Sequence, residues 1–200
     1  TVSGPDGDIE LTAPAAIGHL LTPLKCGPVG HWDRGNICGI HMPGIDLVSV
    51  DELALLSGEN RFAVETETGW EIIQACQIEL IGPQTFRLSH LIRGLAGTDA
   101  DMMDTIPIGA RAAYLNQGFA DMPVSNARIG DDVTFLAEAA GRTSAPLTGT
   151  YHARHLRPLS PVHGKAEIIG GDLHLSWIRR TRIGGDSWAG LDVPLGEDSA

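Results

Sequence analysis

Cysteine is scarce in this sequence, with three in 200 residues. Cys26, Cys38 and Cys76 are odd in number and none belongs to a C-x-x-C pair, so the sequence does not predict a disulfide framework. No stretch of about 18 apolar residues occurs, which argues against a transmembrane segment. The first residues, TVSGPDGDIE, lack the basic and apolar regions of a signal peptide. We therefore expect a protein that is made in the cytoplasm.

Basic residues are also few, with 14 Lys and Arg against 25 Asp and Glu, which gives a net charge of −11. Nucleic-acid-binding proteins draw most of their affinity from Lys and Arg, so this balance predicts no binding of DNA or RNA. Glycine, by contrast, is abundant at 25 of 200 residues, well above the usual ~7%. Many glycines indicate many tight turns, which an all-β fold requires.

The first 60 residues predict little regular structure. Residues 1–36 hold ten prolines and glycines and are expected to form an extended segment that packs against another part of the protein. The apolar stretch 37–50 is interrupted at Pro43-Gly44 as a turn would interrupt it, which predicts two short strands. Ser49 stands three residues before Glu52, the spacing of a capping box, and predicts a helix of about eight residues that ends near Gly58.

An antiparallel meander is predicted next, from the segments RFAVET, WEIIQACQIEL and TFRLSHLIRG between residues 61 and 94. In the third segment, alternation places Phe86, Leu88 and His90 on one face, and Arg87, Ser89 and Leu91 on the other. Two later strands are predicted, with Ala112 and Tyr114 sharing a face in the first, and Val133, Phe135 and Ala137 sharing a face in the second. Residues 1–140 therefore predict a mainly β domain, an antiparallel β-sheet or barrel-like fold with one short helix.

The C-terminal part predicts a second, incomplete domain. Residues 141–163 are rich in Pro, Ser, Thr and Gly, which is typical of a linker or a crossover strand. Residues 164–200 begin with a predicted hairpin that turns at Gly170-Gly171 and continues with alternating Leu173, Leu175 and Trp177. This resembles the start of a fibronectin type III or other immunoglobulin-like β-sandwich, which needs ~100 residues. We therefore expect the sequence to be a fragment of a longer protein.

Candidate chemical sites are few. Cys26, His31, Cys38 and His41 lie within sixteen residues, but their C-x4-H-x6-C-x2-H spacing is not a zinc-finger pattern, and we expect no metal site. No G-x-S-x-G motif presents a serine nucleophile. Pairs such as Glu65 and Glu67 are expected on a solvated edge and not in a sugar cleft. We therefore expect no catalytic residues and no cofactor.

One basic and aromatic cluster lies near the end of the sequence and consists of Trp177, Arg179, Arg180, Arg182 and Trp188. Such side chains can stack on, or pair with, a sugar acid, a phosphate or a partner's carboxylate. The interpretation that we favour is local pairing with Asp172, Asp186 and Asp192.

A set of motifs in the middle of the sequence resembles a known family. A W-E-x-x-Q segment is followed by F-R-L-S-x-L-I-R-G-x-x-G-T, formed by Trp70, Glu71, Gln74, Phe86, Arg87, Leu88, Ser89, Leu91, Ile92, Arg93, Gly94, Gly97 and Thr98. It is similar to the C-terminal region of the large baseplate-hub, or host-specificity, protein of gene transfer agents and siphophage tails. The resemblance continues through IPIGARAAYLN, LRPLSPVH and GDLHLSWIRRTRIGGDSW to VPLGEDSA, and so covers about residues 20–200. Cys38, His41 and Cys76 depart from the pattern.

The motif residues themselves predict structural roles. Gly94 and Gly97 allow a sharp turn after Arg93. Arg87 and Arg93, six apart and expected on one face of the strand, are suited to hold neighbouring loops through bidentate hydrogen bonds. Nothing in the set requires a reacting atom.

The resemblance implies a structural component of a phage-like tail tip, made in the bacterial cytoplasm and assembled into the tail. Copies would surround the tail axis as a trimer, in contact with other baseplate proteins, and this region would shape the tip or face the host envelope. Any glycosidase-like activity would belong to an upstream domain. The alternative is a carbohydrate-binding module that recognises a host surface glycan through the cluster around Trp177. An enzyme is the third and weakest hypothesis.

Overall fold

The structure is a computed structural model that describes residues 1–139 and 141–181. The chain divides into two compact units, Thr1–His152 and Ala153–Ala200. The division falls inside the segment 141–163, and the part of that segment before the division pairs with strands of the first unit.

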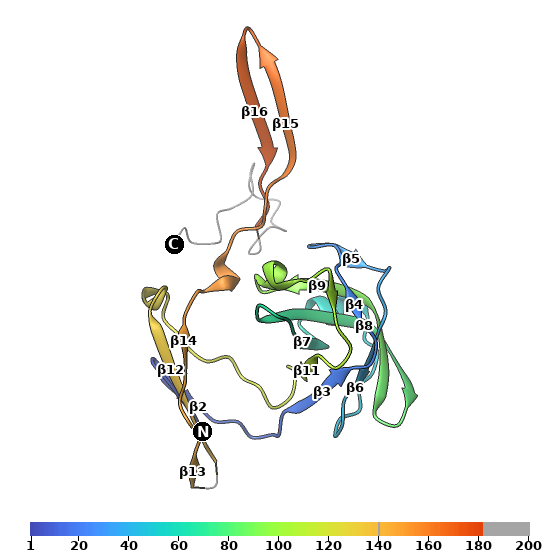
Figure 1. Cartoon of the computed structure of the whole chain (residues 1–200), viewed down its shortest axis with the longest axis vertical. Helices are drawn as coiled ribbons and strands as arrows, with labels where there is room; N and C mark the ends of the chain where they lie inside the picture. Colours follow the sequence, from blue (N-terminus) through green and yellow to red (C-terminus); the bar gives the residue numbers. More distant parts are fainter. Residues whose placement is uncertain (140, 182–200) are drawn as a thin grey trace. The chain divides into compact units, whose positions relative to one another are not determined.

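A closed antiparallel barrel of six strands dominates the first unit (Figure 1). Its strands pair in the order β9–β6–β3–β11–β7–β8, and β8 pairs again with β9 to close the ring. The six strands are β3 (Ala16–Leu20), β6 (Cys38–His41), β7 (Arg61–Glu65), β8 (Trp70–Gly82), β9 (Thr85–Leu95) and β11 (Arg111–Tyr114). The sequence prediction of a mainly β, barrel-like domain with one short helix is therefore confirmed.

The barrel interior is filled by apolar side chains that alternate along the strands. Large residues with no more than 2% exposure include Leu20, Leu24, Ile40, Phe62, Ile73, Phe86, Leu88, Leu91 and Ile106. The prediction that Ala112 and Tyr114 share a face is confirmed, because Ala112 lies in this core and Tyr114 packs against it. The barrel is thus a packed core and not an open pore.

Along strand β9, the alternation of inward-facing and outward-facing side chains is interrupted at one position. Leu88 and Leu91 both point into the core although they are three apart, and residues of a regular strand three apart face opposite sides. His90 between them has a positive φ of 54°, a left-handed conformation that reverses the alternation. Phe86 and Leu88 therefore face inward as predicted, but the grouping of His90 with them and of Leu91 opposite is wrong.

Short strands complete the first unit. β5 (Trp32–Asp33) adds to β9 beyond the end of β6, and β4 (Leu24–Lys25) pairs with β10 (Thr105–Ile106). A separate five-stranded sheet contains β1 (Val2–Gly4), β2 (Gly7–Ile9), β12 (Asp132–Ala139), β13 (Arg142–Thr143) and β14 (Leu147–Thr150). The segment 1–36, predicted to be extended and to pack against another part of the protein, supplies five short strands, and four of them pair with strands later in the sequence. The predicted strand at Val133 is confirmed.

The predicted helix exists but is shorter and capped differently. Helix α1 spans Glu52–Leu56, and its N-cap is Asp51, whose carboxylate accepts a hydrogen bond from the N–H of Ala54 at 2.8 Å. Ser49, the predicted cap, instead accepts the N–H of Ile78 and donates to its carbonyl. Its hydroxyl is therefore already engaged with β8. No strand forms at residues 45–50, so the second strand predicted after Pro43-Gly44 is also wrong.

The described part of the second unit contains a β-hairpin, as predicted. β15 (Val162–Ile169) pairs with β16 (Asp172–Ile178), and Gly170 and Gly171 both have positive φ at the turn. Residues paired directly across a hairpin share a face. One face is apolar, with the pairs Ala166–Leu175 and Ile168–Leu173, and the other is polar, with the pairs Lys165–Ser176 and Glu167–His174. The fibronectin-like sandwich remains a prediction.

In the part of the chain that the structure describes, three short 3-10 helices connect these elements, η1 (Thr98–Asp101), η2 (Asn126–Arg128) and η3 (Arg154–Leu156). Within residues 1–139 and 141–181, none of the helices is long and apolar enough to cross a membrane.

Candidate functional site

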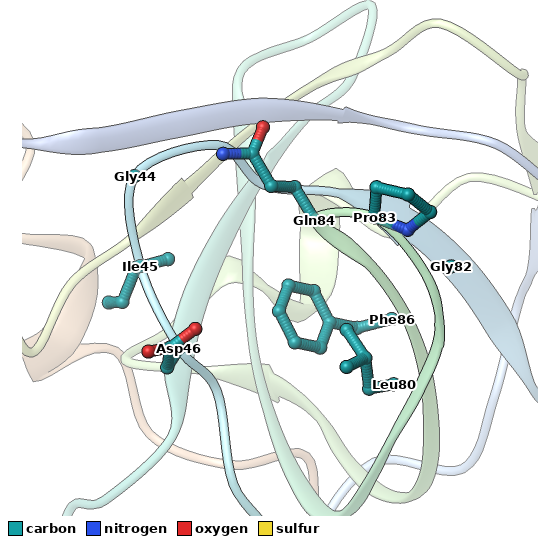
Figure 2. Close-up of a pocket in the computed structure, with 8 residues that line it drawn as sticks. All are labelled: Gly44, Ile45, Asp46, Leu80, Gly82, Pro83, Gln84 and Phe86. Carbon is teal, nitrogen blue, oxygen red and sulfur yellow. The ribbon is translucent and has the colours of Figure 1, made fainter.

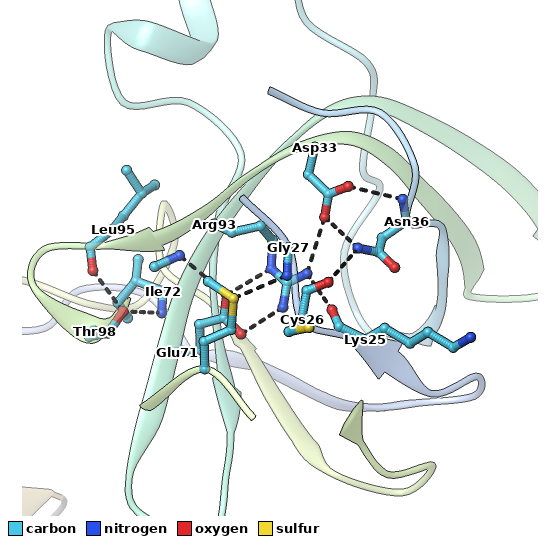
Figure 3. Close-up of polar contacts among 12 residues, drawn as sticks. Lys25, Cys26, Gly27, Asp33, Asn36, Glu71, Ile72, Arg93, Leu95 and Thr98 are labelled. Atoms are coloured by element: carbon cyan, nitrogen blue, oxygen red, sulfur yellow. Dashed lines mark hydrogen bonds and ion pairs between the residues drawn. The ribbon is translucent and has the colours of Figure 1, made fainter. Parts of the chain in front are cut away.

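Arg93, the second arginine of the motif, lies on the barrel strand β9, where it is fully buried and held by Glu71 (Figure 3). Its Nε donates to Glu71 Oε1 at 2.7 Å and its Nη2 donates to Oε2 at 2.8 Å. Neither side chain is exposed. This is the bidentate fork geometry in which an arginine and a carboxylate interact most strongly.

A second carboxylate reaches Arg93 from β5. The Nη1 of Arg93 donates to Asp33 Oδ2 at 3.2 Å and to the carbonyl of Lys25 at 2.7 Å. Asp33 in turn accepts the N–H groups of Gly35 and Asn36 and the side-chain amide of Asn36. One buried guanidinium therefore joins β8, β9 and the segment that carries β4 and β5.

The surroundings of Asp33 and Arg93 favour their ionised forms. Burial by itself would raise the pKa of Asp33, but the hydrogen bonds from Asn36 and Gly35 and the charge of Arg93 hold that pKa below its ordinary value. Burial opposes the charge of Arg93, yet Glu71 and Asp33 raise the pKa of Arg93 above its ordinary value. Both carboxylates make several contacts inside the protein, so the cluster braces the fold.

The motif residues after Arg93 fasten the following turn onto β8. The N–H of Gly94 donates to Glu71 Oε1 at 3.2 Å, and Gly94 and Gly97 have φ of 59° and 76°. A Cβ on Gly94 would lie 2.8 Å from the Cα of Asp99. The hydroxyl of Thr98 accepts the N–H of Ile72 and donates to the carbonyl of Leu95. The predicted role of the two glycines in a sharp turn matches this geometry.

The first motif segment also has bracing contacts. The side-chain amide of Gln74 is buried and donates to the carbonyls of Leu55 and Glu59, both at 2.6 Å, which ties helix α1 to β8. Trp70 is 38% exposed, and the guanidinium of Arg111 lies 5.4 Å from the centre of its ring. This is a cation–π contact at the barrel surface.

Arg87 and Ser89 lie apart from the buried cluster. Arg87 is exposed and donates to Glu79 on the neighbouring strand at 2.8 Å, and Ser89 contacts Gln77 at 3.4 Å. The prediction that Arg87 and Arg93 share a face is wrong, because the left-handed residue His90 lies between them and reverses the alternation.

The predicted Trp–Arg cluster lies only partly within the described residues. Trp177 is 58% exposed on β16, and Arg180 donates to the carbonyl of Ser160 at 3.0 Å. Arg179 follows β16 directly. Arg182 and Trp188 lie outside the residues that the structure describes, as do Asp186 and Asp192, their expected partners.

The cysteine and histidine residues considered for zinc lie in different surroundings. Cys38 is buried in the core, where desolvation raises the pKa of its thiol to about 12, and Cys26 is exposed. The ring of His41 lies beside that of His19, with centroids 5.4 Å apart. Nowhere in the part of the chain that the structure describes do three or more Cys, His, Asp or Glu side chains gather as metal ligands.

Two surface hollows lie along the hairpin β8–β9. One, of about 440 Å³, lies at its turn and is shown in Figure 2, lined by Gly44, Ile45, Asp46, Leu80, Gly82, Pro83, Gln84 and Phe86. The other, of about 430 Å³, is lined by Arg34, Ile37, Gln77, Ser89 and His90. Sequence reasoning singled out neither hollow. It also missed Asp33, whose partner Arg93 is 60 residues away, and Asn36, which donates to Asp33.

Comparison with known families gives one match. Residues 15–113 match the family model described as Rcc01698-like, C-terminal. The matched range begins just before β3 and ends at the third of the four residues of β11, so it contains five barrel strands, most of the sixth, and the cluster around Arg93. No curated protein sequence matches the chain. The barrel of this chain is therefore similar to the C-terminal domain of the Rcc01698-like family.

Proposed function

We propose that this chain is a structural module of the tail tip, or baseplate, of a phage-like particle of the gene-transfer-agent kind. The family name that its barrel matches is associated with gene transfer agents. The ordered motifs from Trp70 to Thr98 resemble those of a baseplate hub, or host-specificity, protein of such tails.

The main support for the proposal is that the motif residues make contacts inside the protein. Glu71, Gln74, Arg93, Gly94 and Thr98 all make internal contacts that lock β8, β9, helix α1 and the turn before η1 together. A module that bears load between neighbouring subunits needs a rigid shape more than a reactive side chain. Buried bracing of this kind supports an assembly role over catalysis.

The proposal also covers the binding partners of the chain and its location in the particle. The protein would be made in the bacterial cytoplasm and would enter the tail beside other tail-tip proteins. Copies of the chain would surround the tail axis as a trimer and support contact with the host envelope. The net charge of −11 supports a module that does not bind the passing DNA.

Cryo-electron microscopy of intact particles tests the proposal. We expect density that fits the six-stranded barrel at the distal end of the tail, in symmetric copies, and its loss from particles made by a strain in which the gene is disrupted. Particles whose tails contain no density for this barrel would rule the proposal out.

A second candidate function is carbohydrate binding by the hairpin. Trp177 is exposed beside a hollow of about 390 Å³ that is also lined by His163, Lys165, Ser176 and Ile178, and an exposed indole offers a surface on which a sugar ring stacks. Binding on a glycan array that is lost in Trp177→Ala, and kept in the opposite-face variant His174→Ala, would support this function. No binding to any host polysaccharide would remove it.

A further inference from the structure

The hollow lined by Arg34, Ile37, Gln77, Ser89 and His90 combines polar side chains with one aliphatic side chain. It lies on the outer surface of the barrel, where β8 and β9 meet the segment that follows β5. Its volume of about 430 Å³ falls within the ~300–1,000 Å³ range of small-molecule sites. None of its side chains takes part in the cluster around Arg93.

His90 is the most unusual residue of this hollow. Its Nε2 is buried, and in the described part of the chain it makes no hydrogen bond, although Glu52 Oε1 lies 3.4 Å away. The imidazole packs on the indole of Trp32, with ring centroids 4.3 Å apart. Buried polar atoms without a partner are rare in folded proteins. His90 and Glu52 are therefore placed so that a small shift in either side chain would complete a hydrogen bond.

The polar groups at the hollow offer both donors and acceptors. The contact between Ser89 and Gln77 is long, at 3.4 Å, and no described residue takes the side-chain N–H groups of Gln77. Ser89 can donate and accept, Gln77 can do both through its amide, and Arg34 can donate. A ligand whose groups also both donate and accept satisfies this set best, and hydroxyl groups have that property.

The charges at the hollow balance. Arg34 and Glu52 lie 3.8 Å apart and both are largely exposed, so a phosphate would meet the carboxylate of Glu52 and a divalent cation would meet the guanidinium of Arg34. Ile37 is 56% exposed and adds an apolar surface to the polar set. This combination favours an uncharged ligand with one polar and one apolar side.

We propose that this hollow binds one unit of a neutral saccharide. The amide of Gln77, the hydroxyl of Ser89 and the guanidinium of Arg34 would contact its hydroxyl groups, and Ile37 would pack on the apolar face of its ring. The inference goes beyond the tail-tip function, and it places sugar binding on the barrel and not at Trp177.

The test uses the full chain and a panel of neutral sugars, namely glucose, galactose, mannose and N-acetylglucosamine, titrated at millimolar concentrations and followed by calorimetry or NMR. We expect one of them to bind, and Gln77→Ala to weaken its affinity by about 3- to 10-fold, the effect of one or two lost hydrogen bonds. Glu79→Ala is the matched control, because Glu79 is the next outward-facing residue of β8 and does not line the hollow. Its affinity should equal that of the unaltered chain.

Three results would overturn the inference: no neutral sugar binds, Gln77→Ala binds as tightly as the unaltered chain, or Trp177→Ala abolishes binding while Gln77→Ala does not. The last result would assign sugar binding to the hairpin instead. None of these results affects the tail-tip proposal, which the particle images test separately.

Discussion

Glu71 on β8 and Arg93 on β9 meet through two hydrogen bonds of 2.7 and 2.8 Å in a place where neither side chain touches solvent. Charges this deeply buried are tolerated when they are paired and their remaining hydrogen-bonding groups are satisfied. Here the backbone N–H of Gly94, the carbonyl of Lys25 and the carboxylate of Asp33 complete the set. The stability of the barrel should therefore depend on each carboxylate.

Removing one partner of the buried pair should destabilise the barrel strongly. We expect Glu71→Gln to lower the free energy of unfolding by ~3–5 kcal/mol, because the guanidinium of Arg93 loses its principal counter-charge while still buried. Urea denaturation followed by tryptophan fluorescence measures this loss. The control is Glu79→Gln, which breaks an exposed pair with Arg87 and should change the free energy by no more than ~0.5 kcal/mol. Equal effects in the two variants would contradict the bracing role of Glu71.

Asp33 should make the stability depend on acid. Its pKa is lowered in the folded protein, so ionised Asp33 stabilises the fold at pH above its unfolded pKa of about 3.9. That contribution is lost as the pH falls through the lower folded pKa. The unaltered chain should therefore unfold at a higher urea concentration than Asp33→Asn near neutral pH, and the gap should close as the pH drops below about 4. A gap that stays constant with pH would show that Asp33 does not contribute through its charge.

Gly94 should tolerate alanine less well than another glycine of similar backbone conformation. Both Gly94 and Gly109 have positive φ, at 59° and 85°, so alanine costs ~1–2 kcal/mol at either position. A Cβ at Gly94 would also approach the backbone of Asp99 to 2.8 Å, whereas one at Gly109 meets nothing within 4 Å. Thermal unfolding should show a clearly larger loss for Gly94→Ala. Similar melting temperatures for the two variants would show that the turn after β9 can relax.

The cysteines should differ in reactivity. Burial raises the pKa of Cys38 to about 12, so its thiol stays protonated and shielded at about pH 8, where an ordinary exposed thiol is partly ionised. An alkylating reagent followed by mass spectrometry of the digested chain should label exposed Cys26 first, and Cys38 only after denaturation. Equal labelling of both in the folded chain would mean that the barrel core opens readily.

The sequence predicts strands better than it predicts their closure into a barrel. The segments RFAVET, WEIIQACQIEL and TFRLSHLIRG are predicted because alternation and turn residues are local signals, and β7, β8 and β9 confirm them. Closure depends on pairs such as His19 with Arg111, which are far apart in the sequence and carry no local signal. The same holds for the cluster around Arg93. Glu71 and Arg93 stand out as motif residues, but Asp33 becomes their neighbour only because β5 adds to β9.

The wrong predictions of the helix N-cap and of the side chains near His90 have local causes. Ser49 and Asp51 are both suitable N-cap residues, and the choice falls to Asp51 because the backbone of Ile78 already engages Ser49. The change of inward face near His90 has no simple pattern in the sequence, because it goes with a positive φ at a residue other than glycine.

The closed barrel and the open hairpin offer different backbone groups to a binding partner. In the barrel every one of the six strands has a neighbour on both sides, so its backbone offers little for an incoming strand to pair with, and recognition there has to use side chains and loops. The hairpin of β15 and β16 leaves one open edge on each strand within the described residues. Within the described residues, the hairpin therefore leaves backbone groups open to the addition of a strand from another chain, known as β-augmentation, whereas the six-stranded ring does not.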